Sequence, residues 1–226
     1  MALLPEEIDF ISNNKVKIKE KRPSVEGMTK FASVFLDDVR IDQVYDLIYS
    51  DKEFTLYGKT EPTFFAYAQK KSKNFNFVDM KFDAAGPEFY SGDPNVKFTN
   101  CPEFSSKFYE YDHPLGNMPF MPKTCHLKEN IKLFWISHEE FDFHSTNLTY
   151  GVPYSDTFEC RALHRVSKKD NGVLVEIYGG VFFTKNTSMK GILKSTTEKG
   201  MVEGCNLAAK EIEKAVNIYK GSSTGQ

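Results

Sequence analysis

Residues 172–183 decide the fold of this chain, and they read Gly-Val-Leu-Val-Glu-Ile-Tyr-Gly-Gly-Val-Phe-Phe. The first part alternates between two sets, Val173, Val175 and Ile177 on one face and Leu174, Glu176 and Tyr178 on the other. A period of two predicts a β-strand that separates the interior from solvent. The preceding turn, residues 168–172, ends in Asn171-Gly172. This pair is a strong hairpin signal, so the strand is expected to pair with the one before it.

The chain before this hairpin contains further strand patterns. Strands are expected over residues 30–36, 107–111, 125–135, 140–148 and 157–166. Asp37 and Asp38 are expected to cap a helix that runs through Ser50 and carries one apolar face, made of Ile41, Val44, Leu47 and Ile48. A helical or mixed stretch is expected over 54–68, and dense Gly and Pro positions over 83–104 predict an irregular loop.

After the hairpin the period becomes helical. Residues 187–219 place one stripe on a single face, namely Met201, Cys205, Ala208, Ile212, Ala215 and Tyr219. At about 1.5 Å per residue this helix would be about 50 Å long, so a break is expected near Gly200 or Gly204. An antiparallel sheet needs its apolar face covered, and this helix is the only long amphipathic element left. The expected class is therefore α+β, a curved antiparallel sheet wrapped around a long C-terminal helix. Such an arrangement often leaves a cavity.

Composition limits the possible functions. The chain has 226 residues, 40% of them hydrophobic, and a net charge of -2. This length suits one domain, and this charge argues against binding nucleic acid through bulk charge. No run approaches the roughly 20 apolar residues of a membrane span, and no secretory signal is visible. The domain is expected over 29–220, with an N-terminal extension (1–28) that is poorly ordered or peripheral and a flexible tail (221–226).

Two sequence patterns could indicate a catalytic or a metal-binding site. His138, Glu140, Asp142 and His144 share one face of a strand, as metal ligands can, or they form a polar face turned to solvent. The intervening Phe141 and Phe143 favour the second interpretation. Cys160 and His164 could in principle meet, but their spacing lies along a strand. Since GxSxG, HExxH and glycine-rich phosphate motifs are absent, no metal, cofactor or catalytic residue is expected.

Two further segments concern lipids and membranes. Residues 113–124 hold three prolines and four apolar side chains, Leu115, Met118, Phe120 and Met121. Such a loop is either pinned on the core or serves as a movable lid or membrane contact. Lysines cluster around the start of the last helix, at positions Lys185, Lys190, Lys194 and Lys199. They form either a solvated face or a patch for anionic lipid head groups.

Several segments in order resemble the VASt domain, the StAR-related lipid-transfer module of the Lam/Ysp and Aster sterol transporters. The resemblance is strongest over residues 109–216. It is carried by Tyr111-Asp-His-Pro-Leu-Gly with Pro122-Lys-Thr, by Val152-Pro-Tyr-Ser-Asp-Thr-Phe, by Val173-Leu-Val-Glu-Ile-Tyr-Gly-Gly-Val and by Lys190-Gly-Ile with the final helix. The first expected helix, residues 41–51, also has a counterpart in the family.

The resemblance implies a START-like helix-grip fold whose internal apolar cavity holds one sterol under a flexible loop. The lid would comprise Leu115, Gly116, Met118, Phe120, Met121 and Pro122. Cavity candidates are Tyr150, Tyr154, Phe158, Val181, Phe183, Ile192, Thr196 and Thr197, and membrane-docking candidates are Lys123, Lys185, Lys190 and Lys194. The loop here is longer and more apolar than the family's, which suits insertion into a membrane.

The resulting expectation is a non-catalytic protein that binds a sterol or similar lipid and transfers it between membranes. It would be a cytoplasmic monomer at organelle contact sites, associated with the ER if part of a larger anchored protein. Its partners would be the lipid and anionic membranes, and not nucleic acid. Two alternatives stay open: a helix-grip enzyme of cyclase or hydrolase type, and an interaction module whose cavity is filled by phenylalanines.

Overall fold

The computed structural model describes residues 22–79, 103–115 and 122–223 of the chain. Its elements in the first part are β1 (Thr29–Leu36), α2 (Ile41–Val44), the π-helical turn η1 (Tyr45–Tyr49), β2 (Phe54–Leu56), β3 (Lys59–Glu61), α3 (Phe64–Lys71) and β4 (Phe75–Asp79). The second part holds β5 (Glu103–Pro114), β6 (Thr124–Ser137), β7 (Glu140–Tyr150), the 3-10 turn η3 (Ser155–Thr157), β8 (Phe158–Lys169), β9 (Gly172–Phe183) and α4 (Lys190–Ser223).

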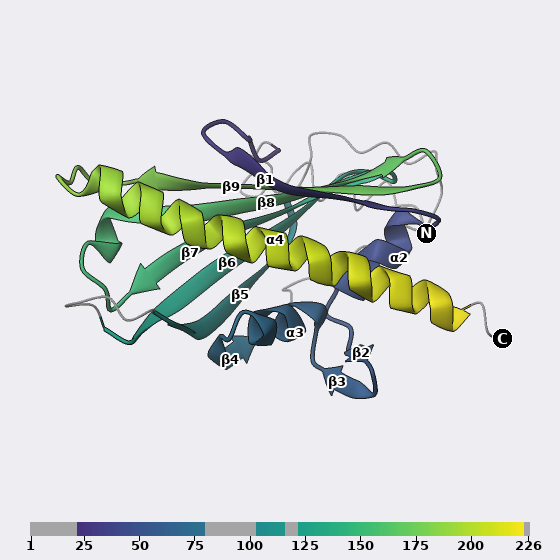
Figure 1. Cartoon of the computed structure of the whole chain (residues 1–226). Helices are drawn as coiled ribbons and strands as arrows, with labels where there is room; N and C mark the ends of the chain where they lie inside the picture. The colour runs from purple at the N-terminus through teal and green to yellow at the C-terminus, as the bar shows by residue number, and fades with distance from the viewer. Residues whose placement is uncertain (1–21, 80–102, 116–121, 224–226) are drawn as a thin grey trace, which may run out of the picture.

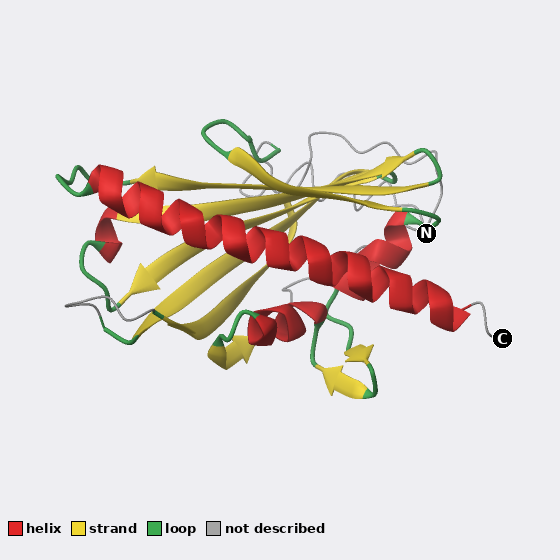
Figure 2. Cartoon of the chain, viewed as in Figure 1, coloured by secondary structure: helices red, strands yellow, loops and turns green. Residues whose placement is uncertain are grey.

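Seven strands form one antiparallel sheet in the order β1-β9-β8-β7-β6-β5-β4, and β2 pairs with β3 in a separate hairpin. The long helix α4 crosses one face of the sheet, and α2 and α3 lie under its C-terminal part (Figures 1 and 2). The expected α+β class is confirmed, and the arrangement is that of a START-like helix-grip fold. We call the sheet face that α4 crosses the inner face and the opposite one the outer face. No described helix combines the length and the apolar character that crossing a membrane requires.

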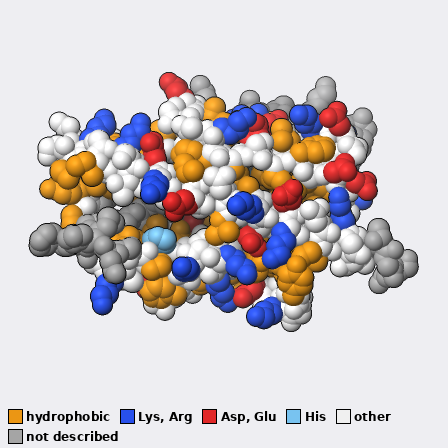
Figure 3. All heavy atoms as spheres, in the orientation of Figure 1, with side chains coloured by type: hydrophobic (Ala, Val, Ile, Leu, Met, Phe, Trp, Pro, Cys, Tyr) orange, Lys and Arg blue, Asp and Glu red, His pale blue; other side chains and the backbone are white. Residues whose placement is uncertain are grey.

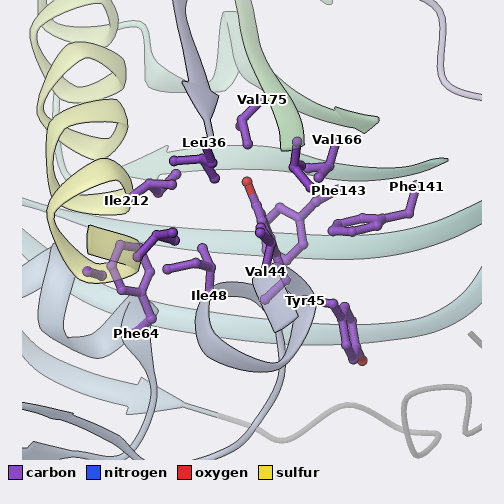
Figure 4. Packing of buried hydrophobic residues seen from close by; sticks show 14 of the residues in the cluster. Leu36, Val44, Tyr45, Ile48, Phe64, Phe141, Phe143, Val166, Val175 and Ile212 are labelled. Carbon is purple, nitrogen blue, oxygen red and sulfur yellow. The ribbon is translucent and has the colours of Figure 1, made fainter. Parts of the chain in front are cut away.

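Strand register arranges the inner face in rows, because residues paired across antiparallel strands point to the same side. Five successive rows run from the β8–β9 hairpin end toward the start of α4: Trp135-Phe141-Val166-Val175, Leu133-Phe143-His164-Ile177, Ile131-Ser145-Ala162-Gly179, Glu129-Asn147-Cys160-Val181 and Leu127-Thr149 with Phe158-Phe183. The first two rows belong to the main core, into which α2, η1, α3 and the C-terminal half of α4 pack. Aromatic edge-to-face contacts such as Tyr45–Trp135, with ring centroids 5.4 Å apart, fill this end. Figure 4 shows Ile212 of α4 and Leu36 of β1 pointing toward each other within it.

The expected break in the last helix is wrong, because α4 is continuous over 34 residues. A helix of this length measures about 50 Å. The 14-residue strand β6 is itself about 46 Å long, so the sheet is large enough to carry the helix. A Cβ atom added at Gly200 or Gly204 would meet nothing within 4 Å. These glycines therefore lie on the exposed side and need no kink.

The expected cap of the first helix is also wrong. The helix begins at Ile41 after Arg40, whose backbone N–H donates to Oε1 of Gln43 at 2.9 Å. Asp38 adopts a left-handed conformation with φ of 46°, and Asp37 accepts a hydrogen bond from Asn171. The two aspartates thus form the turn after β1, and they lie two and three residues before the N-cap position, Arg40. The mixed stretch after it divides into the β2–β3 hairpin and α3, which Thr63 caps by accepting from the Ala66 N–H at 3.1 Å.

The β8–β9 hairpin forms as predicted, but its glycine has another role. Asp170 and Asn171 make the two-residue turn, with Asp170 at φ of 50°, and Gly172 already pairs with Lys169. A Cβ on Gly172 would lie 2.2 Å from the carbonyl oxygen of Leu36. Gly172 is therefore required for the close approach of β1.

Candidate functional site

One end of the sheet collects most of the segments singled out in the sequence. In an antiparallel meander the β5–β6 loop, the β7–β8 connection and the β9–α4 connection all fall at the same end, as Figure 1 shows. The expected lid is the β5–β6 loop, and its two ends are joined because the Leu115 N–H donates to the Lys123 carbonyl at 2.8 Å. Leu115 and Pro122 are half-buried. Gly116, Met118, Phe120 and Met121 lie outside the described residues, as does the expected loop 83–104 apart from its last two positions, which begin β5.

The inner wall at this end forms a small apolar cluster apart from the main core. Phe158, Cys160 and Val181 are buried in it. Phe183 of β9 and Leu193 and Met201 of α4 pack against them and are half-buried. Three of the expected cavity residues, Phe158, Val181 and Phe183, therefore lie together on one wall. We call this region the open end of the inner face.

The N-terminal half of α4 covers the open end without sealing it. Its inward stripe consists of Leu193, Thr197, Met201, Cys205 and Ala208, all half-buried. The first buried residue of the helix is Ala209, more than halfway along. In the space-filling view of Figure 3, apolar side chains remain visible beside α4 at the end of the molecule where the helix begins. An incompletely packed apolar wall and helix stripe are the features that an apolar ligand requires.

A polar group interrupts this apolar wall. Glu129 of β6 is 7% exposed and is flanked by the Tyr111 hydroxyl and the Asn147 amide, each 3.4 Å from a carboxylate oxygen. Burial raises the pKa of Glu129, and hydrogen bonds from Ser145, Asn147 and Tyr111 oppose that rise. The Oδ1 atom of Asn147 is buried and has no hydrogen-bond partner among the described residues. Buried polar atoms rarely stay unpaired, so this position suits a ligand hydroxyl.

Sequence reasoning missed this polar group, although a signal was present. The inward positions of β6 read Cys125, Leu127, Glu129, Ile131, Leu133 and Trp135, with one charged residue among apolar ones. Burying a carboxylate at an inward position of a strand costs free energy, so such a residue usually has hydrogen-bond or ionic partners or serves a function.

The amino-acid sequence matches a known protein family over most of its length. Residues 38–204 match the family described as VAD1 Analog of StAR-related lipid transfer domain, or VASt. The match includes β2 to β9 and the part of α4 that covers the open end. The chain belongs to the VASt family. VASt is a lipid-transfer-type domain and not a catalytic family. A search of curated proteins finds no match to this chain.

The remaining cavity candidates of this VASt domain do not all face the open end. Tyr150 pairs with His126 on the outer face, and the two tilted rings have centroids 6.3 Å apart. Tyr150 is 44% exposed. Tyr154 lies in the left-handed turn before η3 and is 49% exposed. On α4, Ile192 is 63% exposed and Thr196 is exposed, whereas Thr197 is half-buried on the inward stripe. Thr197 is thus the polar candidate that the structure brings to the wall.

The lysine candidates gather at the rim of the same end of the VASt domain. Lys123 is exposed beside the lid loop. Lys185 pairs with Asp156 at 2.6 Å, Lys190 lies 5.2 Å above the Phe183 ring, and Lys194 approaches Glu198 at 3.7 Å. All are solvent-exposed, so their charges can still act on a surface that the open end approaches.

Burial keeps three inward ionisable side chains, His164, Cys160 and Cys205, neutral near pH 7. His164 forms a 3.1 Å hydrogen bond with the Tyr49 hydroxyl, and burial lowers its pKa to about 4. Burial also raises the pKa of the Cys160 and Cys205 thiols to about 12. A thiol with such a pKa stays protonated near neutral pH and is a poor nucleophile.

The polar strand face predicted on β7 is not simply turned to solvent. Asp142 lies on the outer face but is fully buried, where Nε of Arg22 binds it at 2.8 Å and Nε of Arg165 at 3.2 Å. Arg22 also pairs with Glu140. The interpretation as a solvated face is therefore wrong at Asp142, because the N-terminal segment covers it. The described residues contain no group of three or more His, Cys, Asp or Glu side chains placed to hold a metal ion.

Proposed function

We propose that this VASt domain binds one sterol or similar hydroxylated lipid at the open end of the inner face and carries it between membranes. The lipid would lie between the small apolar cluster and the inward stripe of α4, and its hydroxyl would meet Asn147 and Glu129. It needs neither a cofactor nor covalent chemistry. The family match supports lipid binding, and the choice of a hydroxylated ligand rests on the buried polar group.

The observation that carries this proposal is the polar pair Glu129–Asn147 set in an otherwise apolar wall beneath a half-buried helix stripe. A sterol that buries about 400 Å² of apolar surface gains roughly 10 kcal/mol relative to water. One polar contact then orients the lipid, since an unpaired Asn147 oxygen would otherwise remain without a hydrogen bond.

The lipid would enter from a membrane at this same end. Lys123, Lys185, Lys190 and Lys194 surround it, and each lysine near an anionic surface contributes about 1 kcal/mol. The loop of residues 115–123 would move aside while its apolar side chains dip into the bilayer. The domain would act as a peripheral monomer at contact sites between organelle membranes.

A fluorescent sterol tests binding, with two variants on neighbouring positions of α4. Met201→Trp fills the space above Cys160 and Val181 and is expected to abolish saturable one-to-one binding. Val202→Trp lies at an adjacent, 36% exposed position and should bind as the unmodified chain does. Failure of the unmodified chain to bind at micromolar concentration, or equal binding by both variants, would reject the proposed site. Turnover of the bound lipid would show an enzyme in its place.

Transfer between liposomes tests the second half of the proposal. Replacing both Phe120 and Met121 with aspartate should slow transfer to anionic acceptor liposomes at least about tenfold, because charged side chains enter a bilayer poorly. Equilibrium sterol binding in solution should stay unchanged. Unaltered transfer rates would remove this loop from the mechanism.

A further inference from the structure

A concave region lies on the outer face of the sheet, away from α4 and the proposed lipid site. It is a cleft of about 980 Å³ that crosses β5 to β9. Its floor includes the apolar side chains Phe108, Leu148 and Phe182 and the basic side chains Lys128, Lys132 and Arg161. Phe108 is 48% exposed and Leu148 42% exposed, which is unusual for apolar residues in the middle of a sheet.

The chain's own N-terminal segment already forms one wall of this cleft. Five of its residues line the cleft, namely Pro23, Ser24, Glu26, Gly27 and Met28. At one end of this wall Arg22 is held by Asp142 and Glu140. At the other, Gly27 passes so close to β9 that a Cβ on Gly180 would lie 2.9 Å from the Gly27 carbonyl oxygen. The chain that precedes Arg22 therefore begins at the border of the cleft.

The chemistry of residues 1–21 matches the floor of this cleft. Their first part is apolar and acidic, with Leu3, Leu4, Ile8, Phe10 and Ile11 interspersed by Glu6, Glu7 and Asp9. On the floor, Lys128 and Lys132 stand on β6 beside the exposed Phe108 and Leu148, and Lys128 also pairs with Glu110 of β5 at 2.8 Å. The carboxylates of the lining, Glu26 and Glu159, stand on the opposite side, near β8 and the N-terminal wall. Charge complementarity thus favours the β6 side for the acidic residues.

The length of the segment is sufficient. Ten residues lie between Ile11 and Arg22, so the eleven steps from one Cα atom to the next, at about 3.3 Å each, can span about 36 Å. Adjacent strands are about 4.8 Å apart, so the distance from Asp142 on β7 to β5 is well within reach.

We propose that residues 3–11 of the same chain occupy the outer cleft, with Ile8 and Phe10 packed on Phe108 and Leu148 and with Glu6 and Glu7 facing Lys128 and Lys132. The N-terminal segment then closes the exposed centre of the sheet as an intramolecular strap. This inference does not depend on lipid binding at the open end.

Site-specific photo-cross-linking in the full chain tests the strap. With p-benzoylphenylalanine in place of Phe10, irradiation should link residue 10 to peptides that contain Phe108 or Leu148. The yield should be independent of protein concentration, as for an intramolecular contact. The same photo-cross-linker in place of Tyr57, which is 73% exposed on the β2–β3 turn, should give no link to the cleft. Links from position 10 only to other parts of the chain would overturn the proposal. Links that grow with concentration would assign the cleft to a second copy, which also overturns it.

A charge-reversal pair sharpens the test. Lys132→Glu should lower the cross-link yield about threefold to fivefold at low salt, since a surface ion pair contributes up to about 1 kcal/mol. Combining it with Glu7→Lys should restore the yield. No loss in the single variant, or no recovery in the double variant, would contradict the placement of the acidic residues beside β6.

Discussion

The two halves of α4 perform different tasks on the same sheet. In the C-terminal half Ala209, Ile212, Ala215 and Val216 are at most 8% exposed and pack into the main core. In the N-terminal half, residues 190–208, none is buried. Three glycines also fall in this half, at positions 191, 200 and 204. One half therefore fixes the helix to the fold, while the other leaves apolar surface available.

The inner wall under these halves differs in the same way. The packed end holds His164 among aromatic rings, with the Phe143 and Tyr49 rings each 5.8 Å away. The open end holds Glu129 with two long hydrogen bonds and an unpaired amide oxygen next to it. The packed end is filled by aromatic and aliphatic side chains, whereas the open end has only part of its apolar cover. This difference supports the proposal that a lipid binds at the open end.

The largest expected effect tests the difference in packing. Ile212→Ala removes a fully buried side chain from the packed end and should lower the free energy of unfolding by about 3–4 kcal/mol. Leu193→Ala at the half-buried open end should cost about 1 kcal/mol or less in the absence of lipid. Urea unfolding of both variants measures the contrast. Equal losses would mean that the two halves of α4 are packed alike.

The next effect concerns the pH dependence of the packed end. Burial lowers the pKa of His164 from 6.5 to about 4, so the unfolded chain binds more protons between these values. Stability that His164 contributes is therefore full above pH 6.5 and is lost as pH falls toward 4, by about 3 kcal/mol in all. His164→Gln should reduce this loss in thermal unfolding curves recorded from pH 7 to 4. An unchanged pH profile would contradict a neutral buried histidine.

The open end should respond to pH in the opposite direction. Burial raises the pKa of Glu129 above that of the unfolded chain, so the folded state holds its proton more tightly. Stability should then decrease as pH rises from about 4.5 through the folded pKa. Glu129→Gln should add about 1–2 kcal/mol of stability at pH 7 without lipid, because the neutral amide avoids the desolvation cost that raises the pKa of Glu129. The exposed Glu203→Gln serves as control and should have no such effect. Destabilisation by Glu129→Gln would show that the carboxylate is fully compensated by its neighbours.

The sequence predicted the packed end well, because local patterns determine it. Alternation in residues 172–183 gave β9 with its bounds and with Val173, Val175 and Ile177 buried. The Asn171-Gly172 pair correctly predicted the β8–β9 hairpin. The structural reason for Gly172 is different, because it allows the close approach of β1, a contact between distant residues that a local pattern does not reveal. The capping prediction also failed because of a contact between distant residues: the Asp37 side chain accepts a hydrogen bond from Asn171.

The open end was less predictable, because it depends on how separate elements meet. Three of the residues that the resemblance suggested, Phe158, Val181 and Phe183, lie on one wall. The resemblance could not show that Tyr150 stands at an outward-facing position of β7. Glu129 was overlooked since its neighbours in sequence, Lys128 and Asn130, make it look like part of a polar surface. Only the register with Asn147 and Tyr109 shows that it points inward.

The smallest effect tests whether the N-terminal half of α4 must be able to move. A Cβ at Gly200 or Gly204 meets nothing within 4 Å, so alanine at each position should stabilise the helix by about 0.5–1 kcal/mol. Amide hydrogen exchange should become slower over residues 190–208 and stay unchanged over 209–220, where packing already protects the backbone. Gly191→Ala provides a matched control, because it lies at the fraying first turn and should gain less. If lipid enters by local opening of this half, the double variant should take up fluorescent sterol more slowly while its equilibrium affinity is preserved. Uptake at an unchanged rate, together with slower exchange, would show that the β5–β6 loop and not the helix controls entry.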